Sequence, residues 1–173
     1  DGTLQSWNPD PSAYVLNMAL SGTSLFVTGD YFQINWPDAN NFAVVDNTTG
    51  DIYLADLDLG GGTIDYAMTS GNTLYVSGSF TQVNGQSRQG LAAVDITTGT
   101  VLPWSPTTDN LVSAISVNGT SVYLGGNFSD VNGDSRNGLA SVDPTTGNTL
   151  SWNAGVTING EVKTLYATTN QLY

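Results

Sequence analysis

Short runs in which apolar and polar residues alternate, each bounded by turn residues, follow one another along the chain. Val112–Val117 alternates and ends at Asn118-Gly119, a dipeptide typical of β-hairpin turns. Three further runs of this kind follow, at Ser121–Phe128, Gly138–Val142 and Thr149–Trp152. No 3.6-residue periodicity is visible anywhere, so this stretch predicts four short antiparallel strands and the chain predicts almost no helix.

The four-strand pattern repeats along the chain. Thr73–Trp104 and Ser121–Trp152 carry the same sequence pattern 48 residues apart, and a looser copy precedes them, with Phe26, Asp46 and Gly50 in the matching places. A period near this length, built from strand-like pieces, is typical of β-propeller blades. A parallel β-helix is the alternative, although its coils are usually shorter and have less use for a hairpin turn in every unit.

The repeat predicts an all-β fold, a β-propeller with four-stranded antiparallel blades. About three full blades and partial blades at both ends do not close a ring of the usual four to eight. We therefore expect a fragment of a larger ring. Expressed alone, it should aggregate, or dimerise by lending Thr3–Trp7 of one copy to the open blade of another. The expected units are a blade end at 1–14, full blades at 15–63, 64–110 and 111–160, and a blade start at 161–173.

Three consecutive motifs make the repeat resemble a known family. V-Y-L-G-G-N-F at 122–128 is followed by V-N-G-x-S-R-N-G-L-A-x-V-D-x-T-T-G at 131–147 and L-x-W-N at 150–153. This pattern resembles the delta-sixty type propeller repeats of large bacterial surface and secreted proteins. The resemblance is strong over 64–153, weaker over 15–63 and partial at the ends. It implies an extracellular or cell-surface propeller, and it carries no catalytic residues.

Composition excludes several functions. Three basic residues stand against fifteen acidic ones, giving a net charge of −12, which argues against nucleic acid as a partner. The chain contains no Cys and no His, so thiolate chemistry and the commonest general base are missing. No apolar run has the length of a membrane helix, so we expect no membrane insertion. An acidic surface rich in Ser, Thr, Asn and Gly suits a secreted protein.

Residues that recur in each unit are expected to build the scaffold. The tryptophans that end the outer strands should pack between blades, and the arginines of S-R-x-G should pair with a carboxylate, for which Asp95 or Asp143 is suitable. The aspartates of D-x-T-T-G should accept backbone N–H groups in a turn. These repeat positions are Trp7, Trp104, Trp152, Arg88, Arg136, Asp46, Asp95 and Asp143.

One loop has the spacing of a calcium-binding segment. Asp130, Asn132 and Asp134 form D-x-N-x-D, and oxygen ligands at alternate positions suit a hard cation. However, Ser135 stands where an EF-hand has Gly, and Ser141 where it has the bidentate Glu. The matching loop of the preceding unit carries no carboxylate. A turn without metal is therefore the favoured interpretation, with calcium as the alternative and no other cofactor expected.

Residues that break the repeat are the better candidates for ligand binding. Trp36 stands where the other units carry Gly, in a loop that also contains Tyr31 and Asp38. An aromatic ring in a polar loop is suited to stacking on a sugar or a protein partner. Equally, Trp36 could fill the space of a missing arginine, because Ala39 stands where Arg88 and Arg136 stand.

The first hypothesis for function is an extracellular or cell-surface propeller that acts as a binding scaffold for a glycan or protein ligand. The second is the propeller part of a secreted carbohydrate-active enzyme, which would need paired carboxylates. Against it, Glu161 is the sole Glu and most Asp residues fall at turns. The third is a structural subunit of a surface assembly, whose partner is a further set of blades or another copy. Overall the sequence favours a protein that is not an enzyme.

Overall fold

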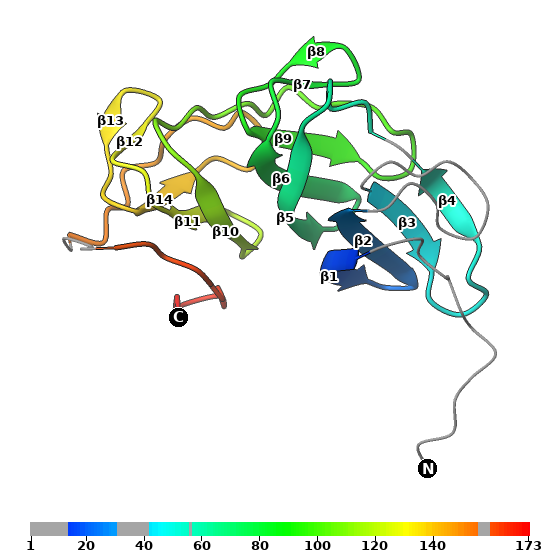
Figure 1. The fold of residues 1–173 in the computed structure, drawn as a ribbon. Coiled ribbons are helices and arrows are strands. Elements are labelled where there is room, and N and C mark those ends of the chain that lie inside the picture. The colour runs from blue at the N-terminus through cyan, green and yellow to red at the C-terminus, as the bar shows by residue number, and fades with distance from the viewer. Residues whose placement is uncertain (1–13, 31–41, 56, 156–159) are drawn as a thin grey trace.

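The computed structural model describes residues 14–30, 42–55, 57–155 and 160–173. These residues form 14 β-strands and no helix (Figure 1). The part of the chain described here accordingly has no helix long and apolar enough to cross a membrane. The predicted all-β class is confirmed.

The first sheet has four antiparallel strands in the order β1-β2-β3-β4. Gly22, with φ of 59°, makes the turn between the first two strands possible. The strands are β1 (Tyr14–Ser21), β2 (Ser24–Asp30), β3 (Phe42–Asp46) and β4 (Ile52–Ala55).

The second and third sheets have three antiparallel strands each and share one register. Tyr75 lies opposite Ala93 in the second sheet, and Tyr123 lies opposite Ser141 in the third. The second sheet consists of β5 (Thr63–Ser70), β6 (Thr73–Ser79) and β9 (Leu91–Asp95). The third consists of β10 (Val112–Val117), β11 (Val122–Gly126) and β14 (Leu139–Val142).

A small two-stranded ribbon follows the middle strand of the second and third sheets. Asn84 and Asn132 have φ of 50° and 54°, and the glycine after each also has positive φ, which is the geometry of a type I′ hairpin turn. The sequence had predicted only a loop here. The ribbons are β7 (Gln82–Val83) with β8 (Gln86–Ser87), and β12 (Asp130–Val131) with β13 (Asp134–Ser135).

The fourth strand predicted for every unit is present only in the first sheet. In the others it is reduced to single bridges, Val101 to Val94 and Thr149 to Val142. Leu102 still donates its N–H to the Ala93 carbonyl, but Pro103 follows it and has no N–H to continue the ladder. The four-stranded prediction is therefore wrong for the second and third units, whose outer segments are held by side chains described below.

Two glycines in the middle strands allow a close backbone approach. A Cβ at Gly78 would lie 2.0 Å from the Thr63 carbonyl oxygen, and a Cβ at Gly126 would lie 2.1 Å from that of Leu111. Both contacts sit beside an irregularity in the first strand of the sheet, between Ile64 and Tyr66 and between Val112 and Ala114. No larger residue fits either position without moving the strand.

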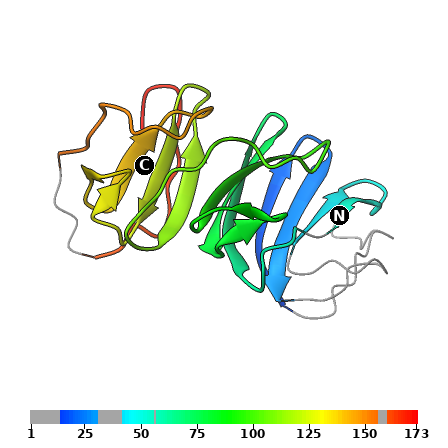
Figure 2. The same cartoon turned by 90° about the horizontal axis from the view of Figure 1, so that it is seen from above.

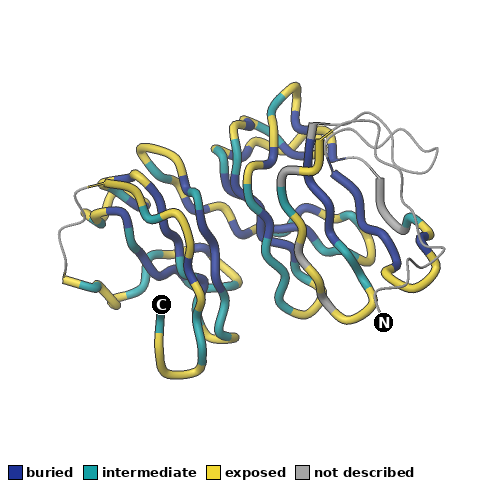
Figure 3. The backbone as a smooth tube through the Cα atoms, turned by 60° about the horizontal axis from the view of Figure 1, so that its bottom comes forward, coloured by how far each residue is buried: buried dark blue, intermediate teal, exposed yellow. Residues whose placement is uncertain are grey.

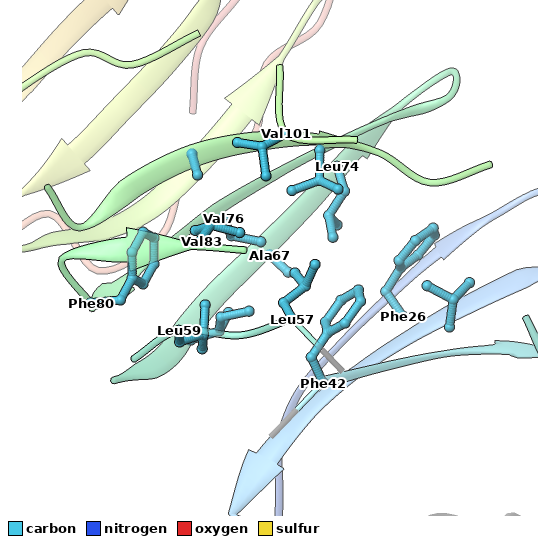
Figure 4. Close-up of a cluster of buried hydrophobic side chains, with 14 residues drawn as sticks. Phe26, Phe42, Leu57, Leu59, Ala67, Leu74, Val76, Phe80, Val83 and Val101 are labelled. Carbon is cyan, nitrogen blue, oxygen red and sulfur yellow. The ribbon is translucent and has the colours of Figure 1, made fainter. Parts of the chain in front are cut away.

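The three sheets lie side by side in chain order and pack face to face (Figures 1 and 2). Most of their strand residues are buried (Figure 3). Alternate residues of β6 enter different cores: Leu74 and Val76 pack with Phe26 and Phe42 of the first sheet (Figure 4), whereas Tyr75 packs with Leu124 of the third. Each sheet thus buries its apolar residues against its neighbour, as in other repeat architectures.

The segment 160–173 packs against the third sheet. The Val162 N–H donates to the Gly126 carbonyl at 3.1 Å, and the Ala167 N–H donates to the Ser116 hydroxyl at 2.9 Å. Ser113 also hydrogen-bonds the Glu161 carboxylate. The segment then turns back on itself, with Tyr166 and Tyr173 exchanging two backbone hydrogen bonds.

Candidate binding site

The junction between the second and third sheets is built on one aromatic pair. Trp104 is fully buried and meets Tyr75 edge-to-face, with ring centroids 5.0 Å apart. The Trp104 Nε1 donates to the Asp143 carbonyl at 3.0 Å, and the Tyr75 hydroxyl donates to the Pro144 carbonyl at 2.9 Å. Burial, and then the charge of Asp143, raise the pKa of Tyr75, so its phenol remains a hydrogen-bond donor. One turn of the third sheet thus satisfies both donors of the pair.

The equivalent pair of the third sheet is open. Tyr123 and Trp152 keep the edge-to-face arrangement at 5.3 Å, but Trp152 is 38% exposed. The Asn118 amide Nδ2 donates to the Tyr123 hydroxyl at 3.3 Å. The two rings line a cavity of about 310 Å³, together with Asn118, Thr169, Asn170, Gln171 and Leu172. Aromatic rings beside amide groups make this cavity a candidate binding site.

A second cavity of comparable size lies between the second and third sheets. Its lining includes Phe80, Gln89, Asp109 and Leu111. The Asp109 carboxylate accepts the Ser129 hydroxyl at 2.5 Å and two backbone N–H groups, and the Ser129 hydroxyl is the largest cause of its lowered pKa. The hydrogen bonds of Asp109 therefore fix the start of the β12–β13 ribbon.

The expected arginine–carboxylate pair is wrong. The Arg88 guanidinium donates to the carbonyls of Ser87 at 2.7 Å and Leu102 at 2.6 Å. Arg136 makes the matching bonds, to Ser135 at 2.8 Å and Leu150 at 3.1 Å. Each guanidinium ties its ribbon to the outer segment, taking carbonyls that a longer strand would use. The ion pair found in the described residues is instead Lys163 with Glu161, at 4.0 Å on the surface.

The aspartates of D-x-T-T-G form the predicted turn. Asp46, Asp95 and Asp143 each accept the backbone N–H groups of the residues two and three positions later, at 2.7–2.9 Å. The Thr98 N–H lowers the pKa of Asp95, and the Thr146 N–H lowers that of Asp143. These carboxylates serve the turn and are not available as a catalytic pair.

The three candidate calcium ligands do not converge. Asp130 lies opposite Ser135 and Val131 opposite Asp134, so Asp130 and Asp134 are placed on opposite faces of the ribbon. The Asn132 Oδ1 accepts the Thr107 N–H at 2.8 Å, and the Asp130 Oδ1 accepts the Gly133 N–H at 2.7 Å. In the part of the chain that the structure describes, no three acidic side chains form a group suited to a metal. This geometry favours the turn interpretation.

Asn84 and Asn132 have a scaffold role that the sequence did not predict. Each accepts a backbone N–H across to the preceding segment, from Asp58 and Thr107 respectively, at 2.9 and 2.8 Å. Each also donates to a turn carbonyl, of Gly99 or Gly147. Their recurrence in V-N-G was the available signal. Trp7, Tyr31, Trp36 and Asp38 lie outside the described residues.

Comparisons with known proteins bear on the fold alone. No protein-family model and no curated protein matches the chain. The crystal structure of the computationally designed Ika4 protein is similar over 98% of this chain and 91% of its own, with a TM-score of 0.67 and 15% identity. That of the designed Ika8 protein is similar over 90% of this chain and 53% of its own, with a TM-score of 0.51 and 15% identity.

Proposed function

We propose that this chain is part of a β-propeller of the delta-sixty type, in which each sheet is a blade, and that it acts outside the cell as a binding scaffold for a glycan or protein ligand. The observation that carries the proposal is that the recurring side chains bond the backbone of the fold, whereas other side chains are exposed. Tyr75, Trp104, Arg88 and Asp143 all satisfy backbone groups of the fold. They build sheets and junctions and leave recognition to other residues.

An exposed apolar surface on the first sheet supports a binding role. Val15, Met18 and Leu20 pair with Gly29, Val27 and Leu25, which alternate along β2, so all three are placed on one face of the sheet. They are 38%, 61% and 61% exposed. Apolar side chains gathered on one exposed face are typical of an interaction surface. Tyr14, also exposed, pairs with Asp30, the residue that directly precedes Tyr31.

Glycan-array binding of the fluorescently labelled chain tests the proposal, with Trp36→Ala, Met18→Ser and the surface variant Lys163→Gln run in parallel. We expect saturable binding that Trp36→Ala or Met18→Ser weakens and Lys163→Gln does not. If no glycan binds, the same four proteins are tested for binding to immobilised secreted and surface proteins. Release of reducing sugar from a polysaccharide, abolished by an aspartate variant, would instead favour the enzyme hypothesis.

A further inference from the structure

Two equivalent aromatic pairs in this chain differ in one respect. Tyr123 and Trp152 stand 48 residues after Tyr75 and Trp104. Both pairs meet edge-to-face, at interplanar angles of 76° and 86°. Trp104 is 0% exposed, because it lies in the core between the second and third sheets, and it bonds the Asp143 carbonyl at the start of the Asp143–Gly147 turn. Trp152 is 38% exposed. The geometry that receives an Asp-x-Thr-Thr-Gly turn is therefore repeated, but no turn of that kind bonds the second copy in the described residues.

The donors of the open pair are also in place. The Tyr123 hydroxyl accepts from the Asn118 amide, so its own O–H remains available to donate. In the covered pair the corresponding hydroxyl donates to the Pro144 carbonyl and the indole donates to the Asp143 carbonyl. The Trp152 Nε1 makes no hydrogen bond to any described residue. Two adjacent donors thus match the spacing of two consecutive backbone carbonyls.

The segment 160–173 forms the rest of this face and offers a backbone edge to a further strand. Val162 and Leu165 pack against Gly125, where a Cβ would come within 2.6 Å of the Val162 side chain. The hairpin formed by Ala167 and Leu172 then borders the cavity beside Trp152. A backbone edge next to a cavity lined by aromatic rings and amide groups is an arrangement that an added β-strand can use.

We propose that the Tyr123–Trp152 face is a docking site for one class of partner: a β-strand that ends in an Asp-x-Thr-Thr-Gly turn, with the chemistry of Leu139–Gly147. The turn presents its first two carbonyls to the Trp152 indole and the Tyr123 hydroxyl. Its strand adds to the edge at Leu172, because the backbone groups of Tyr173 already pair with Tyr166. This inference rests on the proposed scaffold function and names its partner. The contact that this chain makes internally at Trp104 is its template.

The test uses the full chain and a fluorescein-labelled synthetic peptide with the sequence of residues 138–152, followed by fluorescence polarisation. We expect saturable binding that is at least tenfold weaker for Trp152→Ala and measurably weaker for Tyr123→Phe, which keeps the ring and removes only the donor. Leu111→Ala, an exposed apolar residue at the other cavity, should bind as the wild type does. A peptide with Gly147→Val should lose binding, because the turn needs φ of 77° at that position.

Three outcomes would overturn the inference: no binding of the peptide, equal binding of the Gly147→Val peptide, or unchanged binding by both Trp152→Ala and Tyr123→Phe. The Tyr123→Phe protein keeps the test decisive if Trp152→Ala does not fold. An oligosaccharide that binds the wild type but not Trp152→Ala, with no peptide binding, would identify the cavity as a glycan site. That result would refute the docking proposal and leave the scaffold function standing.

Discussion

Replacing Trp104 and Trp152 with alanine, one at a time, compares the same repeat position in a covered and an open setting. Trp104→Ala removes a fully buried indole, a change that costs about 3–5 kcal/mol in protein cores. It also leaves the Asp143 carbonyl without its donor, which adds about 1 kcal/mol. The expected total is a loss of about 4–6 kcal/mol in the free energy of unfolding.

Trp152→Ala should cost less. This indole is 38% exposed, and its described contact is the edge of Tyr123. Partial burial and one ring contact together correspond to about 1–2 kcal/mol. For a chain of this size, each kcal/mol lowers the melting temperature by about 2–4 °C. The two variants should therefore differ by roughly 10 °C in melting temperature.

Urea denaturation followed by circular dichroism and by fluorescence measures both losses. The comparison is valid where the two probes give the same transition and the slope with urea matches the wild type. Trp104→Phe serves as an intermediate variant, because it retains a large ring and loses the hydrogen bond. Equal losses for Trp104→Ala and Trp152→Ala, or a larger loss at Trp152, would refute the assignment of Trp104 as the covered junction residue.

The remaining predictions concern the turn, a glycine and the calcium loop. Hydrogen bonds lower the pKa of Asp143 in the folded state, so its stabilising effect is present above its unfolded pKa near 3.9 and is lost as pH falls through the folded value. The wild type should lose more stability than Asp143→Asn between about pH 4 and pH 2 in acid titrations, and parallel curves would contradict this. Gly126→Ala should lower the melting temperature strongly, because the added carbon meets the Leu111 carbonyl, whereas Gly78→Ser should lower it only slightly further than Gly78→Ala does. A melting temperature of Gly126→Ala within 2 °C of the wild type, which corresponds to about 1 kcal/mol or less, would disprove that clash. Chelator should leave the melting temperature unchanged, because the Asn132 oxygen is already bonded to Thr107; a rise of the midpoint with excess calcium would restore the metal site.

Local sequence determined the inner strands and the aspartate turns of this protein. Alternation in Val112–Val117 gave a strand with those bounds, and D-x-T-T-G gave an aspartate-capped turn in all three copies. These features depend on contacts within a few residues, so they can be predicted without knowing what lies across the junction.

Tertiary structure decided what each repeated side chain does. Arg88 and Arg136 bind backbone carbonyls, although their charge alone had predicted a carboxylate, because the outer segment passes the guanidinium and presents free carbonyls there. Trp104 and Trp152 occupy the same place in the repeat, yet one is covered and the other half open. The sequence pattern is identical at both positions, and only the neighbouring sheet, with its carbonyls and its apolar face, sets the burial of each ring.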